Sequence, residues 1–154
     1  MHEEALVHGT CLAIGSQGVL LVGKPGSGKS DLALRLIDQP GTGISGRLRT
    51  ALLVADAQVA LRRHDGGLIA AAPVALKGKM ELRGLGIAAL PVEAQARLRL
   101  AVRLTPAAEI ERLPELGNAR MDLLGSSLPL ILLDPQSASA PARLRAALDQ
   151  FVRP

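Results

Sequence analysis

The sequence predicts a strand-rich, mixed α/β fold, and three observations lead to this class. Short apolar runs bounded by Gly-rich or Asp-Gly turns recur along the chain. Only two stretches space their apolar residues as a helix does, and a Gly-rich segment joins a buried strand to the first of them. A doubly wound fold would alternate strands with helices, and that alternation is absent here. We expect residues 1–154 to form one domain, because this length supports one core.

Eight or nine strands are expected, most of them paired in hairpins. Residues 5–14 and 19–23 flank a Gly-rich turn, and residues 58–62 and 68–72 flank an Asp-Gly turn. The alternation of Leu or Val with Arg over 97–104 predicts a strand with one buried face. The other expected strands are 51–55, 80–83, 87–90 and 130–133.

Two helices and one loop complete the expected elements. Apolar residues at helical spacing predict the first helix over 30–37. Ser139 is expected to cap a second helix, with Pro141 in its first turn and Phe151 on its apolar face. Residues 39–46 hold one proline and three glycines, and this composition predicts a flexible loop.

The composition argues against several classes of protein. The only aromatic residue is Phe151, so the stacking platforms that bind single-stranded nucleic acid are missing. The net charge is +4, from scattered basic residues that are typical of a solvated surface. No apolar run reaches the roughly 18 residues of a membrane span. Cys11 is the one cysteine, which fits a reducing compartment. We therefore expect a cytoplasmic protein that binds neither nucleic acid nor membrane.

The motif that carries most chemistry follows the strand at 19–22. Its residues fit the pattern G-x-x-x-x-G-K-[ST] and are Gly23, Lys24, Pro25, Gly26, Ser27, Gly28, Lys29 and Ser30. Glycines allow backbone N–H groups to converge on an anion, and the helix that follows adds its N-terminal dipole. Lys29 is placed to reach the β- and γ-phosphates, and the Ser30 hydroxyl to bind Mg²⁺. The motif predicts binding of a nucleoside triphosphate such as ATP.

Two further segments contain candidate site residues. Asp56 ends a buried strand, where a carboxylate can hold Mg²⁺, activate a water or accept a hydroxyl proton; it can equally initiate a turn. Glu81 and Arg83 are expected on one face of a strand, either as an ion pair or as a metal ligand and a phosphate contact. Gly84 and Gly86 would let the backbone approach a ligand closely.

His8 precedes Gly9 on a strand that we expect to pair back toward the phosphate loop. A lone strand histidine is more often structural than catalytic, so both interpretations remain open. Cys11 points to the opposite face from His8, which excludes a Cys/His pair and indicates a small core residue.

With these segments in order, the chain resembles the catalytic domain of bacterial HPr kinase/phosphorylase. The resemblance covers residues 8–87, a little over half of the chain. The matching segments are His8-Gly9, the loop 23–30 with Asp31, Leu53-Val54-Ala55-Asp56 and Glu81-Leu82-Arg83-Gly84-Leu85-Gly86-Ile87. Many families share the loop, but its combination with the last segment is much more specific.

The resemblance implies an ATP-dependent kinase that phosphorylates a serine of HPr, or of a nitrogen-system homologue, and a reverse phosphorolysis. It also implies a strand-rich fold like the nucleotide-binding core of phosphoenolpyruvate carboxykinase, and a homo-oligomer, a hexamer in the family. By position, Lys29 would bind the transferring phosphate, and Ser30 and Glu81 would hold Mg²⁺. Asp56 would take the serine proton and return it in the reverse reaction. His8 would lie near the phosphate.

The chain departs from the family pattern at four places. Asp56 is followed by Ala57, where the family has a second aspartate. The loop 39–46 is longer than the family's connection, and we expect a short member without the N-terminal regulatory domain, like the alphaproteobacterial ones. The family's Pro-Gly-Arg-Asn-like stretch is also missing, which leaves as candidates for its catalytic arginine Arg120, Arg143 and Arg145.

These departures keep two alternatives open. One is a nucleotide-binding regulatory module with impaired catalysis, which Ala57 suggests. The other is a small-molecule kinase with the same phosphate loop, in which residues 39–46 would have to serve as the lid.

Overall fold

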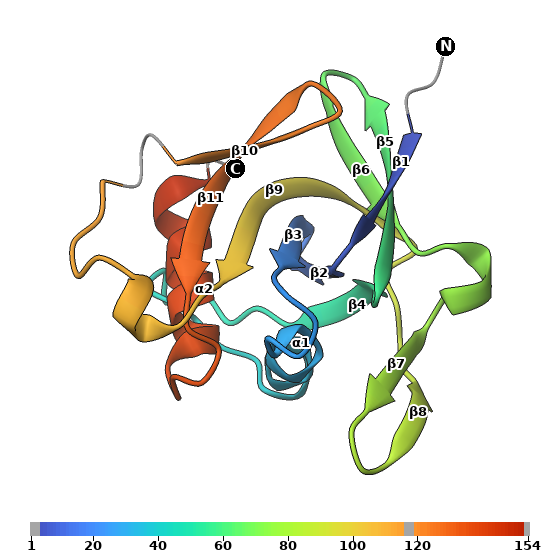
Figure 1. The fold of residues 1–154 in the computed structure, drawn as a ribbon, viewed down its shortest axis with the longest axis horizontal. Helices are drawn as coiled ribbons and strands as arrows, with labels where there is room; N and C mark the ends of the chain where they lie inside the picture. Colours follow the sequence, from blue (N-terminus) through green and yellow to red (C-terminus); the bar gives the residue numbers. More distant parts are fainter. Residues whose placement is uncertain (1–3, 116–118, 153–154) are drawn as a thin grey trace.

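A curved sheet with two helices on one face organises the chain (Figure 1). The computed structural model describes residues 4–115 and 119–152. The strands are β1 Glu4–His8, β2 Thr10–Ile14, β3 Gln17–Val22, β4 Ala51–Ala55, β5 Gln58–His64, β6 Gly67–Ala71, β7 Lys79–Leu82, β8 Gly86–Ala89, β9 Gln95–Leu104, β10 Arg120–Leu123 and β11 Ser126–Leu133. The helices are α1 Lys29–Asp38 and α2 Ala140–Phe151, with short 3-10 turns at Val74–Leu76 and Ala107–Glu109. The predicted strand-rich α/β class with two main helices is confirmed.

The long strand β9 is where the sheet divides. On one side it pairs in parallel with β3; on the other it pairs with β6 near Gln95–Arg97 and with β11 along 101–104. The strand order is β1-β5-β6-β9-β3-β2-β4, with β10 and β11 branching from β9. Because β3, β9 and β11 are parallel, the loops after these strands leave from one edge.

The expected alternation over 97–104 is confirmed in burial, since the Leu and Val residues are buried and Arg99 and Arg103 are exposed. The buried residues do not all face one core, however. The register with β3 slips between Gly18 and Val19, whose partners are Leu98 and Leu100. This irregularity turns Leu98 to one core and Leu100 to the other.

The two cores lie on opposite faces of the sheet. One lies under the helices and joins Leu32 and Leu36 of α1 to Leu144 and Leu148 of α2. The other is enclosed by the curl of the sheet and is built from small and branched side chains, among them Cys11. With no buried aromatic residue, Leu, Val, Ile and Ala fill both cores.

Residues 5–14 form two strands, not the one expected. The chain changes partner at Gly9: β1 pairs with β5, and β2 pairs with β3 and β4. A Cβ at Gly9 would lie 2.7 Å from the Leu21 carbonyl oxygen, which explains the glycine at this crossing. The partner strand breaks at the same level, between β4 and β5. The two segments thus form a long antiparallel ribbon with one kink.

The predicted Asp-Gly turn and the predicted start of the second helix are both present. Asp65 and Gly66 have φ angles of 48° and 76°, as a type I′ hairpin turn between β5 and β6 requires. Ser139 is the N-cap of α2 by position, with Pro141 near the first turn. Its side chain makes no capping hydrogen bond, however, and its hydroxyl lies 3.1 Å from that of Ser137.

The loop before β4 is held in place, so the prediction of a flexible loop is wrong. Asp149 of α2 accepts hydrogen bonds from the backbone N–H groups of Ile44 and Ser45, at 3.0 and 3.1 Å. Arg145 is 2% exposed and donates to the carbonyl oxygens of Leu36 and Gln39 at the end of α1. Both loop ends are therefore fastened to α2, a role that the sequence pattern did not indicate. Among the helices of the described residues, none has the length and apolar character needed to cross a membrane.

Candidate active site

The phosphate loop leads from β3 into α1, as predicted. Gly26 and Gly28 have φ angles of 79° and 102°, a left-handed conformation that favours glycine. Gly28 is the N-cap of α1, so the first turn of the helix directs its free N–H groups toward the loop. The Ser27 N–H donates to the Lys24 carbonyl at 3.0 Å, which closes a tight turn. The loop has the backbone geometry of an anion site.

The Lys29 side chain curls back over this loop. Its Nζ donates to the carbonyl oxygens of Gly23, at 2.9 Å, and of Lys24, at 3.1 Å. The residue is buried, and burial lowers the pKa of Lys29, while the nearby charge of Asp56 partly opposes this effect. A buried ammonium group at a loop of N–H donors is suited to an anionic ligand.

Asp56 lies beside the start of α1, although 26 residues separate it from Ser30. The Ser30 hydroxyl donates to the Asp56 carboxylate, at 3.0 Å from Oδ1 and 3.3 Å from Oδ2. Asp56 is 8% exposed and belongs to the bend between β4 and β5. Three of the predicted site residues, Lys29, Ser30 and Asp56, are thus brought together.

Thr10 is a member of this cluster that the sequence analysis missed. It is 1% exposed, and its hydroxyl donates to Asp56 Oδ1 at 2.8 Å. The available signal was a single hydroxyl residue inside an apolar strand, next to the glycine at which the strand kinks. Without the pairing of β2 with β4, that signal does not indicate a partner.

His8 lies at the end of β1, next to the residue at which the ribbon changes partner. It pairs with Gln58 of β5, and it is exposed. The expectation that its strand pairs back toward the phosphate loop is wrong, because the change of partner at Gly9 assigns that pairing to β2. Its backbone remains near the Asp56 bend through the hydrogen bond from Gly9 N–H to the Ala57 carbonyl.

Glu81, Arg83 and the two glycines form the β7–β8 hairpin, which extends from the sheet at the lower right of Figure 1. Glu81 is exposed on β7 and pairs with Ile87. Arg83 lies in the turn, so the expectation that it shares a strand face with Glu81 is wrong. Gly84 and Gly86 have φ angles of 87° and 102°. The hairpin is anchored by Met80, which is buried in the core beside α1.

Metal-ligating side chains are sparse around the loop. Within residues 4–115 and 119–152, no three His, Cys, Asp or Glu residues gather closely enough to hold a metal ion. At the end of the loop, the Ser30 hydroxyl contacts the Asp56 carboxylate. Glu81 therefore stays a prediction as a metal ligand.

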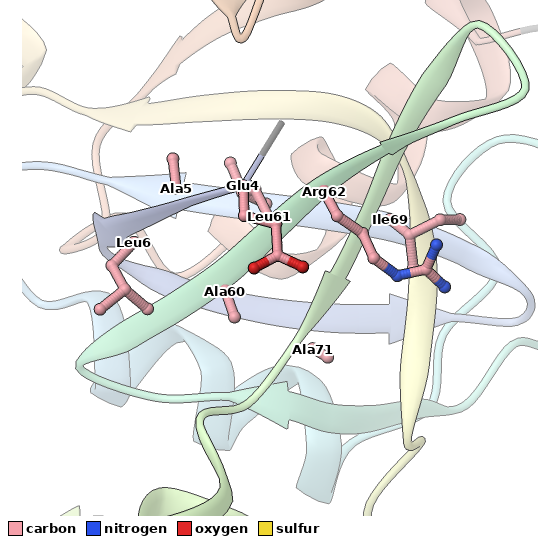
Figure 2. A pocket seen from close by; sticks show the side chains of 8 residues that line it. All are labelled: Glu4, Ala5, Leu6, Ala60, Leu61, Arg62, Ile69 and Ala71. Atoms are coloured by element: carbon pink, nitrogen blue, oxygen red, sulfur yellow. The ribbon is translucent and has the colours of Figure 1, made fainter. Parts of the chain in front are cut away.

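Two cavities lie away from the phosphate loop. The first, of about 350 Å³, is lined by side chains of β1, β5 and β6, among them Leu6, Arg62 and Ile69 (Figure 2). The second is a groove of about 920 Å³ between β11, α2 and the segment that contains Leu113; Phe151 lines it. No residue of the phosphate loop lines either cavity.

The three candidates for a catalytic arginine, Arg120, Arg143 and Arg145, make different contacts. Arg145 is committed to the end of α1, so it is a structural residue. Arg120 donates to the Ser127 hydroxyl within the β10–β11 hairpin, at 2.9 Å. Arg143 is exposed and lines the groove of α2. None of these contacts joins an arginine to Asp56.

Comparison with known proteins identifies the family of this chain. Residues 1–138 match the family described as HPr Serine kinase C-terminal domain. The HPr kinase/phosphorylase of Bordetella pertussis is 37% identical over 138 residues, which cover 82% of this chain and 41% of that protein. The HPr kinase/phosphorylase of Mycoplasma genitalium is 34% identical over 131 residues, covering 80% and 37%. The chain thus spans about two fifths of the length of these curated relatives.

A solved structure is also similar. The HPr(Ser) kinase/phosphatase from Coxiella burnetii superposes with a TM-score of 0.75 at 26% sequence identity. The superposition covers 95% of this chain and 88% of that one. The similarity therefore extends over the C-terminal part as well as the motifs.

Proposed function

This chain belongs to the HPr serine kinase C-terminal domain family, and on that premise we propose that it transfers the γ-phosphoryl group of ATP to a serine hydroxyl of an HPr-type phosphocarrier protein. The observation that carries the proposal is the convergence of Lys29, Ser30 and Asp56 at one end of the phosphate loop. This arrangement combines an anion-binding loop, a cation and a proton acceptor, which are the parts that phosphoryl transfer needs.

Each residue then has a defined task. Lys29, released from the Gly23 and Lys24 carbonyls, would pair with phosphate oxygens and offset the charge that develops during transfer. Asp56 would accept the serine proton through Oδ2, because Oδ1 already accepts from two hydroxyl groups and Oδ2 only from the longer branch of the Ser30 contact. The serine oxygen, as it loses its proton, attacks the γ-phosphorus, and ADP leaves.

The residues of the loop also fit a bound Mg²⁺ and polyphosphate. Ser27 Oγ is buried and has no hydrogen-bond partner among the described residues, as expected for a hydroxyl that faces a ligand site. Ser30 and Asp56 present oxygen atoms, which Mg²⁺ prefers as ligands. A cation held by these oxygen atoms would supply positive charge beside the phosphates. We propose Ser30 as its ligand and Glu81 as a second, contributed from the β7–β8 hairpin beside α1.

The remaining predicted residues have supporting roles in this proposal. Arg83, Gly84 and Gly86 would approach the phosphates or the partner from the turn of the hairpin, where they are exposed. His8 would lie near the phosphate site, since the N–H of the neighbouring Gly9 donates to the Ala57 carbonyl beside Asp56. Reverse phosphorolysis, a role in controlling the phosphotransferase system, a homo-oligomeric state and a cytoplasmic location remain predictions from the family.

The direct test is incubation with γ-labelled ATP, Mg²⁺ and purified HPr from the same cell, with the nitrogen-system homologue in a parallel reaction. We expect label on a serine of one phosphocarrier and none on a serine-to-alanine variant of it. ATP binding without label on either phosphocarrier would overturn the proposal. Label that appears only on small molecules of a cell extract would instead identify the small-molecule kinase.

Ala57 supports a second candidate, a nucleotide-binding regulatory module with impaired catalysis. Its φ angle is 69°, a left-handed conformation in which Asp and Asn occur much more often than Ala. A carboxylate at this position would thus suit the backbone. Ala57→Asp decides between the candidates: a large gain in transfer with unchanged ATP affinity supports an impaired module, and an unchanged rate supports the kinase.

A further inference from the structure

The kinked ribbon that crosses the candidate active site suggests a role for Thr10. In this ribbon, β1 pairs with β5 on one side of the kink and β2 pairs with β4 on the other. Gly9 and Thr10 occupy the kink on one strand, and Asp56 and Ala57 occupy it on the other. The kink therefore places Thr10 directly against the carboxylate.

Side-chain and backbone contacts both hold Asp56 at this point. The Thr10 hydroxyl donates to Oδ1 at 2.8 Å. The Gly9 N–H donates to the Ala57 carbonyl at 3.2 Å, and the Gln58 N–H donates to the Asp56 carbonyl at 2.9 Å. Two consecutive residues of one strand thus fix the backbone and the side chain of the bend.

The contact of Thr10 with Asp56 is less open to competition from a ligand than the contact of Ser30 with Asp56. Thr10 is 1% exposed, and its backbone is held in the ladder by Leu21 of β3. Ser30 lies in the first turn of α1 and is only partly buried, so a ligand can compete for its hydroxyl. Two hydroxyl groups donate to Asp56 Oδ1. A bound ligand could draw the Ser30 hydroxyl away, whereas the Thr10 hydroxyl is buried out of its reach.

We propose that Thr10 is a positioning residue: its hydroxyl holds Asp56 Oδ1, so that Oδ2 is directed toward the serine hydroxyl of the substrate. This rests on the proposed function, in which Asp56 accepts the proton. Orientation matters here because the neighbouring position is Ala57, so the bend offers a single carboxylate. A buried carboxylate that loses a hydrogen bond also loses a defined geometry.

Thr10→Val tests the proposal, since valine keeps the shape and removes the hydroxyl. We expect kcat to fall about tenfold, the usual scale for one lost hydrogen bond to a charged group, with KM for ATP unchanged. Thr10→Ser keeps the hydroxyl and should stay within about twofold of the parent rate. Thr50→Val, at an exposed position, is the matched control. Equal rates in the valine and parent proteins, or an equal loss in the serine variant, would overturn the proposal.

A second measurement uses the free protein and needs no transfer. In protein labelled with ¹³C at Asp Cγ, Asp56→Asn identifies the Asp56 signal by its loss. We expect Thr10→Val to move this signal, and Thr10→Ser and Thr50→Val to leave it in place. A signal that Thr10→Val leaves unmoved would refute the contact and with it the positioning role. If the parent protein fails to label any phosphocarrier, the proposed function fails, and this spectrum still decides whether Thr10 holds Asp56.

Discussion

Arg49 and Asp149, one hundred residues apart, form an ion pair of 2.8 Å between Nη1 and Oδ1 that joins the loop before β4 to the last helix. Both side chains are largely buried, and Asp149 also accepts two backbone hydrogen bonds from the loop. The contact holds the start of β4 against α2, and Arg145 of the same helix holds the end of α1. Helix α1 and strand β4 are the two elements that bring Ser30 and Asp56 together.

We expect Asp149→Ala to lower the free energy of unfolding by about 2–4 kcal/mol, because it leaves a buried guanidinium and two N–H groups without their acceptor. Gln150→Ala, at the exposed neighbouring position on α2, is the control and should change it by less than about 0.5 kcal/mol. Urea unfolding of both variants measures the difference. Equal midpoints for the two would show that the ion pair does not stabilise the loop.

Asp56→Asn should abolish phosphoryl transfer and leave ATP affinity within about threefold of the parent, because the amide keeps the shape and cannot accept the proton. Calorimetric titration with ATP and the labelling assay with HPr measure the two quantities. Full transfer activity in this variant would show that another group takes the proton.

The affinity for ATP should decline at high pH, starting below the ordinary pKa of a lysine. Burial lowers the pKa of Lys29, so the free protein loses this cation earlier than an exposed lysine would. Above that pKa, binding must take up a proton, and affinity falls about tenfold per pH unit. Lys29→Met should bind ATP weakly at every pH and lack this decline; Lys24→Met serves as the control for an exposed lysine of the loop. The same decline in Lys29→Met would assign it to another group.

Cys11 should be inert to alkylation in the folded protein. It is fully buried, and burial raises the pKa of its thiol from 9.0 to about 12. The thiolate is the reactive form, so neither access nor charge favours reaction at neutral pH. We expect iodoacetamide to modify Cys11 only in denaturant, as measured by mass spectrometry. Rapid modification under native conditions would mean that the core around Cys11 opens to solvent.

ATP and GTP should bind with similar affinity. The chain has no Tyr or Trp to stack on the base, and its one Phe, Phe151, lines the groove of α2 rather than the phosphate loop. Affinity should therefore come mostly from the phosphates and Mg²⁺. Titration with both nucleotides measures this, and a strong preference for ATP would indicate a base pocket built from other groups.

The sequence by itself determined what depends on neighbours along the chain. Gly26 and Gly28 set the conformation of the phosphate loop, the Asp65-Gly66 pair sets a hairpin, and spacing predicts both helices. The motifs were also sufficient to indicate the family, because the phosphate loop is combined with the segment 81–87.

Only the tertiary structure decided the contacts between distant residues. The partner of Thr10 is 46 residues away and that of Arg49 is 100 residues away, and the residue types alone predict neither pair. The sequence pattern over 97–104 predicts that the buried residues share one face. The register with β3 contains an irregularity that the pattern does not reveal, and Leu98 and Leu100 therefore face different cores. Strand pairing and helix docking bury these groups together, and burial makes their hydrogen bonds obligatory. Local pattern therefore predicts the phosphate loop, whereas the position of the carboxylate beside it depends on the packing of the whole sheet.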